Sequence, residues 1–96
     1  MISVTQTKFF ASWKAGLRDR RAAKRIDTAI FRLRRGLGNV KRLSPLVSEV
    51  KIDHEPGYRL YFTRRGSELI ILLCGGVKGS QQHDIEKAEE MAAEIR

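Results

Sequence analysis

The spacing of apolar residues in the first 38 positions predicts two consecutive helices. The first begins after Thr5 or Thr7, since either hydroxyl can accept a hydrogen bond from the first turn, and it runs to about position 17. Its apolar residues recur at helical spacing: Phe9, Phe10, Trp13 and Leu17. The second begins after Asp19, and its apolar face steps at intervals of three or four residues: Ala22, Ala23, Ile26, Ile30, Leu33 and Leu37. Gly36 and Gly38 end this helix, which gives a helical hairpin with an apolar inside and a basic outside.

Beyond the hairpin the apolar period shortens from 3.6 to 2, which predicts strands. We expect three of them, at residues 46–53, 58–64 and 68–74, joined by turns at 55–57 and 65–67. Strands joined by such short turns are antiparallel. A short strand at residues 2–4 is a further expectation.

The double glycine Gly75-Gly76 is expected to end the last of these strands. A final helix then begins at Ser80 or Gln81, with an apolar stripe that consists of Ile85, Ala88, Ala92 and Ile95. The predicted fold class is therefore α+β: an N-terminal helical hairpin packed on a small antiparallel sheet with a C-terminal helix. A chain of 96 residues is long enough for one such domain.

The strand at 58–64 separates two kinds of side chain onto its two faces. Apolar residues occupy one face: Tyr58, Leu60 and Phe62. The other face carries Arg59, Tyr61 and Thr63, and we expect it to be polar and open to solvent. On that expectation, truncation of Arg59 opens no cavity in the core.

Positive charge is concentrated in one segment of the chain. The formal net charge is +8, and the segment from Lys14 to Arg42 has eleven basic and two acidic residues, a net charge of +9. The rest of the chain has a net charge of −1. A field of this kind attracts polyanions, so nucleic acid or an acidic protein is the expected partner, and a merely solvated helix face is the alternative. The candidate RNA-binding residues of this segment are Arg20, Arg21, Lys24 and Arg25.

Several classes of protein are excluded by composition and motifs. The single cysteine, Cys74, rules out an internal disulfide framework and a multi-cysteine zinc site, and we expect an inert buried thiol. The chain has no apolar run of membrane-spanning length and no signal peptide, which predicts a cytoplasmic protein with no membrane partner. It also has no phosphate-binding loop, nucleophile elbow or dinucleotide motif. No metal and no cofactor are expected.

A cluster of polar residues on the sheet is the candidate site. Arg59 and Tyr61 lie on one strand, Glu49 and Lys51 lie on the preceding strand, and Lys78 and Gln81 follow the double glycine. The candidate catalytic residues are Arg59, Tyr61 and Lys78, and Lys51 and Gln81 are further candidate RNA-binding residues. Such cations can bind a phosphodiester and stabilise the charge that develops on phosphorus when a ribose hydroxyl attacks it. Two structural alternatives stay open at this stage. Arg59 can form an exposed ion pair with Glu49 across the strands, and Tyr61 can be a packing residue.

The sequence resembles the RelE/ParE toxin superfamily along nearly its whole length. Within the superfamily it is most similar to the short phage-type addiction-module killer proteins, which are related to HigB. The matching segments are 49–53, 56–62, 69–78, Gln81 and 84–85. The N-terminal pattern also matches, at Thr7, Phe9 or Phe10, Trp13, Leu17, Asp19, Ala23, Arg25, Ile26, Leu33, Gly36 and Asn39.

The resemblance implies a toxin of a type II toxin–antitoxin system with a RelE-like, microbial-RNase-like fold. Toxins of this kind enter the ribosomal A site and cut messenger RNA without a metal ion. Carried over to this chain, Arg59 is the residue that contacts the scissile phosphate, and Lys78 is the second cation. Gln81 and Asp84 match characteristic positions of the branch. Val77 departs from the branch, which usually has an acidic residue there.

The resemblance also implies partners. These are the ribosome with its messenger RNA and a cognate antitoxin, expected to be a small helix-turn-helix protein. Two other functions stay open at this stage: a ParE-type inhibitor of DNA gyrase that is not an enzyme, and an inactive nucleic-acid-binding relic. Only the endonuclease requires the set of Arg59, Tyr61 and Lys78.

Overall fold

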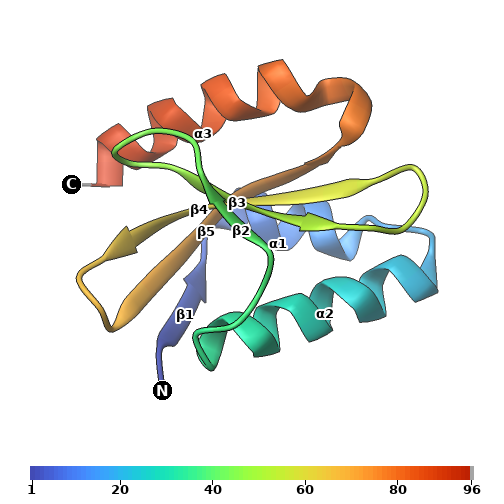
Figure 1. Cartoon of the computed structure of the whole chain (residues 1–96). Helices are drawn as coiled ribbons and strands as arrows, with labels where there is room; N and C mark the ends of the chain where they lie inside the picture. The colour runs from blue at the N-terminus through green and yellow to red at the C-terminus, as the bar shows by residue number, and fades with distance from the viewer. Residues whose placement is uncertain (96) are drawn as a thin grey trace.

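The computed structural model describes residues 1–95 and contains five strands and three α-helices over that range (Figure 1). In chain order the elements are β1 (Ser3–Gln6), α1 (Lys8–Ala15), α2 (Arg20–Arg34), β2 (Val40–Arg42), β3 (Ser48–Ile52), β4 (Tyr58–Arg65), β5 (Leu69–Val77), a short 3-10 helix η1 (Lys78–Ser80) and α3 (Gln81–Ile95). The predicted α+β class is confirmed.

The sheet is mixed, and the expectation of a wholly antiparallel sheet is wrong. Its strand order is β1-β5-β4-β3-β2, and β1 pairs with β5 in the parallel direction while the other neighbours are antiparallel. The short-turn argument holds for the strands it was applied to. It does not apply to β1, which is separated from β5 by two helices and three strands, and such a long connection permits parallel pairing.

Side-chain caps fix the starts of the first two helices as expected. The Thr7 hydroxyl accepts a hydrogen bond from the Phe10 amide at 3.1 Å, and the Asp19 carboxylate accepts from the amides of Arg21 and Ala22 at 2.9 and 3.1 Å. Both helices are shorter than expected, since α1 ends at Ala15 and α2 at Arg34. Leu37 lies beyond the end of α2 and is 50% exposed. Phe9 lies in the first turn of α1 but is also on the outside, at 57% exposed.

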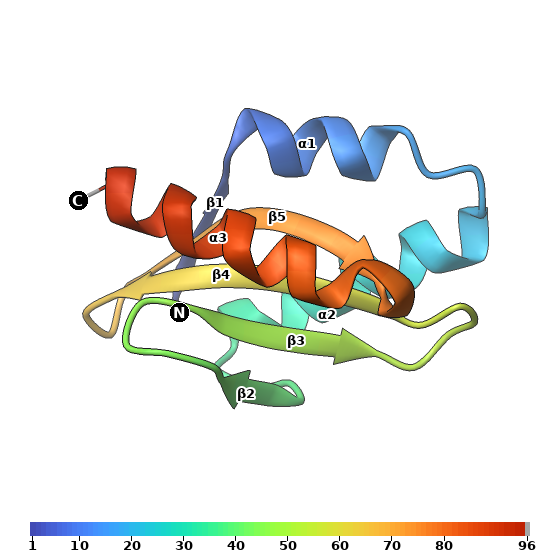
Figure 2. The ribbon, with the colours of Figure 1, turned by 90° about the horizontal axis from the view of Figure 1, so that it is seen from above.

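The sheet lies between α2 and α3, which cover its two opposite faces (Figures 1 and 2). On the α2 face the main core contains buried residues from both helices of the N-terminal half and from the strands, among them Phe10, Ile26, Leu60, Phe62, Ile70 and Leu72. On the α3 face a smaller core contains Val47, Tyr61, Leu73, Cys74, Ala88 and Ala92. Within residues 1–95 no helix combines the length and the apolar character that a membrane span needs.

The helix α1 lies along the outer edge of β5, beyond the end of β1, rather than stacked with α2 on one face of the sheet (Figure 2). The Thr7 amide donates to the Leu72 carbonyl at 3.0 Å, and the Thr7 hydroxyl donates to the Leu73 carbonyl at 2.6 Å. An ion pair of 2.6 Å between Lys14 and Asp27 joins α1 to α2. The expected hairpin is thus present in sequence, but its two helices cover different parts of the sheet.

The double glycine does not end β5, contrary to expectation, and the strand continues to Val77. Gly75 pairs with Leu60 and Gly76 pairs with Arg59. Glycine is required here because of close approaches rather than a turn: a Cβ at Gly75 would overlap the Trp13 ring, and one at Gly76 would overlap the Asp84 carboxylate.

Candidate active site

The face of β4 that carries Arg59 and Tyr61 is buried beneath α3, so the expectation of a solvent-open polar face is wrong. Arg59 is 8% exposed, Tyr61 is fully buried and Glu49 on β3 is 5% exposed. The helix can pack this closely because it presents two buried alanines, Ala88 and Ala92, to the sheet. The polar residues of the face are therefore enclosed at the interface between the sheet and the helix.

Glu49 and Arg59 form an ion pair across β3 and β4. The register places Glu49 opposite Tyr61, and Lys51 opposite Arg59, so the pair is diagonal. The Arg59 Nε lies 3.6 Å from Glu49 Oε1, which is an ionic contact without a hydrogen bond. The sequence predicted an exposed ion pair with Glu49 as the alternative to a functional role for Arg59. The ion pair is present, but it is buried.

Three polar atoms of this cluster are buried without a hydrogen-bond partner among residues 1–95: Glu49 Oε1, Arg59 Nε and the Tyr61 hydroxyl. Burial without a hydrogen bond costs about 1–3 kcal/mol of stability for each such atom, and the ionic contact between Arg59 Nε and Glu49 Oε1 offsets part of that cost for these two atoms. The terminal nitrogens of Arg59 are not among them, and they make no hydrogen bond within the described range. Unpartnered polar groups gathered in one place are a mark of a functional site.

Burial keeps the Tyr61 hydroxyl neutral. It raises the pKa of Tyr61 to about 12, and the nearby charges of Glu49 and Asp84 act in the same direction. The Tyr61 hydroxyl is therefore a hydrogen-bond donor at neutral pH. Burial also raises the pKa of the neighbouring Cys74 thiol to about 11, with the Asp84 charge as the second cause, so this thiol is inert as expected.

Asp84 lies beside the cluster, in the first turn of α3. It is 9% exposed and accepts a hydrogen bond from the Ser80 hydroxyl. Its carboxylate occupies the space above Gly76 that a side chain would fill. A carboxylate in the first turn also interacts favourably with the positive end of the helix.

Two exposed lysines flank the cluster. Lys51 is the register partner of Arg59 on β3, and Lys78 begins η1 two residues after Gly76, which is the register partner of Arg59 on β5. The Lys78 amide donates to the Gly57 carbonyl at 2.9 Å, which ties this corner to the β3–β4 turn. The structure therefore brings Lys51, Arg59 and Lys78 onto three adjacent strand ends, with Gln81 following at the start of α3.

The basic residues of α2 do not join this cluster. Arg20, Arg21, Lys24 and Arg25 are exposed on α2, which covers the other face of the sheet (Figure 1). Both the basic residues of the helix and the cluster were expected to contact RNA. In the structure the sheet separates them.

The sequence predicted Glu49 on the polar face beside Arg59, but not its burial. Its alternation with Lys51 placed it on the correct face, but nothing in the strand pattern indicated that α3 would cover that face. The signal that could have found it is the stripe of small residues on the last helix, which allows close packing on a sheet.

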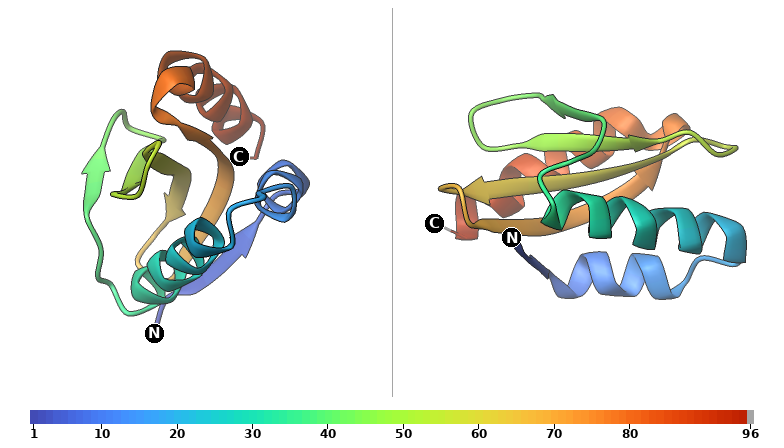
Figure 3. Two further views of the ribbon diagram at one scale, coloured as in Figure 1. Left: turned by 90° about the vertical axis from the view of Figure 1, so that its right-hand side faces the viewer. Right: turned by 60° about the horizontal axis from the view of Figure 1, so that its bottom comes forward.

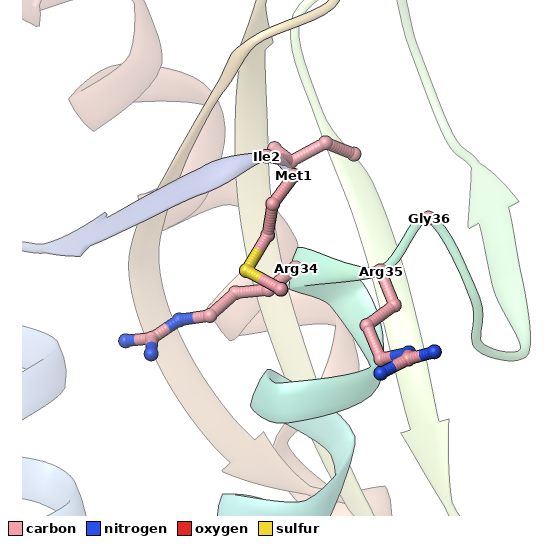
Figure 4. Close-up of a pocket in the computed structure, with 5 residues that line it drawn as sticks. All are labelled: Met1, Ile2, Arg34, Arg35 and Gly36. Carbon is pink, nitrogen blue, oxygen red and sulfur yellow. The ribbon is translucent and has the colours of Figure 1, made fainter.

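A hollow of about 380 Å³ lies far from the cluster, where the N-terminus meets the end of α2 (Figure 4). Its two arginines, Arg34 and Arg35, point away from each other. They do not converge on a common ligand, so we assign no site there.

No known family model matches the chain. A protein of Haemophilus influenzae, described as an uncharacterized protein, is 38% identical over 95 residues, which cover 98% of this chain and 96% of that protein. An identity of this level over nearly the full length of both chains shows common descent and a common fold. The chain therefore belongs to the same family as this H. influenzae protein.

Proposed function

We propose that the chain is the toxin of a type II toxin–antitoxin system and cuts messenger RNA on the ribosome. The observation that carries the proposal is the buried cluster of Glu49, Arg59 and Tyr61, which is flanked by Lys51 and Lys78. Three of its buried polar atoms have no hydrogen-bond partner among residues 1–95. The resemblance to the RelE/ParE superfamily supports it, because it assigns two residues of this cluster, Arg59 and Lys78, to the active site. A RelE-like fold, a cytoplasmic location and a helix-turn-helix antitoxin are parts of the proposal.

The cluster has the groups that cleavage by the neighbouring ribose hydroxyl requires. The 2′-oxygen attacks phosphorus while Glu49 accepts its proton. The bond to the 5′-oxygen breaks and the leaving 5′-oxygen takes up a proton from water, which leaves a 2′,3′-cyclic phosphate and a 5′-hydroxyl. Arg59 and the flanking lysines stabilise the extra negative charge on the phosphoryl oxygens. The neutral Tyr61 hydroxyl donates a hydrogen bond to the same charge or to the leaving oxygen.

Burial of the site supports a requirement for the ribosome. Arg59 and Glu49 face each other at 3.6 Å, so a phosphate has to enter between groups that already interact. Positioning of the message by the ribosome supplies the orientation that the free protein lacks. We therefore expect cleavage of ribosome-bound message and little cleavage of free RNA.

The test compares Arg59→Lys with Arg64→Lys. The first variant keeps a positive charge beside Glu49 but loses the guanidinium donors, and it should lower cleavage of ribosome-bound message by roughly 100- to 1000-fold, or about 2.7–4 kcal/mol in the barrier. Arg64 is an exposed arginine on the same strand, so its replacement should leave the rate unchanged. Thermal melting of both variants checks that each is folded.

Arg59→Ala is a less clean test than the sequence suggested, because it leaves Glu49 buried without its ionic partner. Folded Arg59→Lys protein that cuts at the wild-type rate would exclude Arg59 from the reaction. Growth arrest in which DNA synthesis stops first, with messenger RNA intact, would instead favour the gyrase inhibitor. No growth arrest from soluble protein would favour the inactive relic.

A further inference from the structure

The charged residues of the two covering helices are distributed unequally. The segment Arg20–Arg34 of α2 has six basic residues and one acidic residue, whereas Gln81–Ile95 of α3 has five acidic residues and one lysine. The candidate active site lies on the α3 face, so it is on the acidic side of the molecule. An RNA strand held at Arg59 reaches the positive charge of α2 only by passing around an edge of the sheet.

The two edges of the sheet are covered to different extents. The edge of β5 is covered by β1 up to Leu72, and α1 then lies along it as far as Gly75, where Trp13 packs. The edge of β3 is covered by β2 only as far as Val50. Lys51 and Ile52 have no strand beside them on that side within the described residues. The passage from one face to the other is therefore at the end of β3.

A groove of about 290 Å³ begins at this open edge, between α2 and β3. Arg25, Thr28 and Arg32 line it from α2, and Lys51 and Ile52 line it from β3, together with Asn39 of the connecting segment. Among residues 1–95 no acidic residue lines it. Two guanidinium groups beside hydroxyl and amide donors form a surface suited to phosphate oxygens.

Lys51 connects the groove with the active site. It lines the groove, and it is also the register partner of Arg59. Its neighbours Val50 and Ile52 are buried in the core of the α2 face, so alternation directs the Lys51 side chain to the face of Arg59 and Glu49. One exposed residue therefore borders both places.

We propose that single-stranded RNA bound at the Arg59 cluster crosses the open edge of β3 at Lys51 and continues into the groove, where Arg25 and Arg32 hold its phosphates. The placement of one end of the RNA at Arg59 rests on the proposed function. It divides the basic residues of α2 into two sets. Arg25 and Arg32 contact the RNA, whereas Arg20 and Arg34 do not. Arg34 is nine residues from Arg25, which at about 100° per residue places it on the opposite side of the helix.

The experiment uses two double variants that remove equal charge from the same helix: Arg25→Ala with Arg32→Ala, and Arg20→Ala with Arg34→Ala. The probes are fluorescein-labelled oligomers of 2′-O-methyluridine, which lack the attacking hydroxyl and cannot be cleaved. One has ten nucleotides and is measured by anisotropy over a range of salt concentrations. The other has three nucleotides and is measured by competition.

We expect the groove variant to bind the ten-nucleotide RNA about tenfold more weakly, and to lower the slope of log K against log salt by about 1.4, or about 0.7 for each lost phosphate contact. The matched variant should change affinity less than threefold. The three-nucleotide RNA should bind equally to both variants, because it fills the Arg59 cluster without reaching the groove. Melting curves check that both variants are folded.

Equal weakening by the two double variants would overturn the path, because only the total charge of α2 would then matter. Equal loss for the short and the long RNA would also overturn it. A groove variant that binds RNA normally but no longer binds the antitoxin would assign the groove to an acidic protein instead. These outcomes are independent of cleavage: a length-dependent loss of binding with no cleavage of ribosome-bound message would support the path and refute the proposed endonuclease.

Discussion

The two faces of the sheet are built from the same strands and differ in nearly every other respect. On the α2 face, alternate residues of β4 join a core of large aliphatic and aromatic side chains. On the α3 face, the intervening residues of the same strand include a buried arginine and a buried tyrosine whose polar atoms lack partners. The helices that cover the two faces lie on opposite sides of the sheet (Figure 3). They differ as well, since α2 is basic and α3 is acidic.

This difference separates stability from activity along a single strand. Leu60 has no polar atom to satisfy and is fully buried, so it contributes free energy of folding. Its neighbours Arg59 and Tyr61 lose free energy on burial, because Nε and the hydroxyl are left without hydrogen bonds. A protein retains such residues where they serve a ligand, and the fold is stabilised by the other face.

The largest effect is expected on the α2 face. Leu60→Ala should lower the free energy of unfolding by about 2–5 kcal/mol, because it removes buried methyl groups and leaves a cavity in a packed core. Leu37→Ala is the matched control, since Leu37 is 50% exposed and its truncation should change stability by less than about 0.5 kcal/mol. Urea unfolding of both variants measures the two values. Equal losses would contradict the assignment of the main core to this face.

A smaller effect is expected where the α3 face is most crowded. Gly76→Ala should destabilise the protein by about 1–3 kcal/mol, because the new methyl group overlaps the Asp84 carboxylate and forces the start of α3 away from the sheet. It should also reduce cleavage, since Arg59 is the register partner of Gly76. Gly79→Ala, three residues later, is the control: no atom lies within 4 Å of its added Cβ. A Gly76→Ala protein as stable as the control would show that α3 does not depend on this contact.

Local sequence signals predicted much of the fold. The capping residues Thr7 and Asp19, and the alternation in β4, act over a few residues and were sufficient to locate the helices and the antiparallel strands. Two features depend on contacts between distant segments. The parallel pairing of β1 with β5 joins residues more than sixty positions apart, and the exposed strand β2 is held only by its pairing with β3.

The candidate site was predicted only in part, because its burial also depends on contacts between distant segments. Alternation placed Arg59, Tyr61 and Glu49 on one face, and the register confirms that they are neighbours. Their burial depends on where α3 packs, which no strand pattern reveals. The double glycine shows the same limit: as a local signal it indicates the end of a strand, but here it makes room for Trp13 and Asp84.

The smallest effect, and the one that most sharply separates the two faces, is expected for Tyr61→Phe. The Tyr61 hydroxyl is buried and has no partner, so its removal costs no hydrogen bond and ends an unfavourable desolvation. At pH 7 the variant should be as stable as the wild type, or more stable by about 1 kcal/mol. If the hydroxyl stabilised the fold, its removal would instead lower the free energy of unfolding. Cleavage should fall, because the donor is gone.

The same variant should change how stability depends on pH. The pKa of Tyr61 is raised from 10 in the unfolded chain to about 12 in the folded protein. The stability that this shift contributes is fully present below pH 10 and is lost as the pH rises towards 12. Between these values the wild type should lose up to about 1.4 kcal/mol per pH unit more than Tyr61→Phe. The pKa of Cys74 is also raised, from 9 to about 11. Its effect on the pH dependence of stability is the same in the wild type and in Tyr61→Phe, so it cancels when the two proteins are compared. Urea unfolding at pH 8, 10 and 11 measures that difference, and parallel curves for the two proteins would mean that the Tyr61 hydroxyl reaches water, which would remove it from the buried cluster.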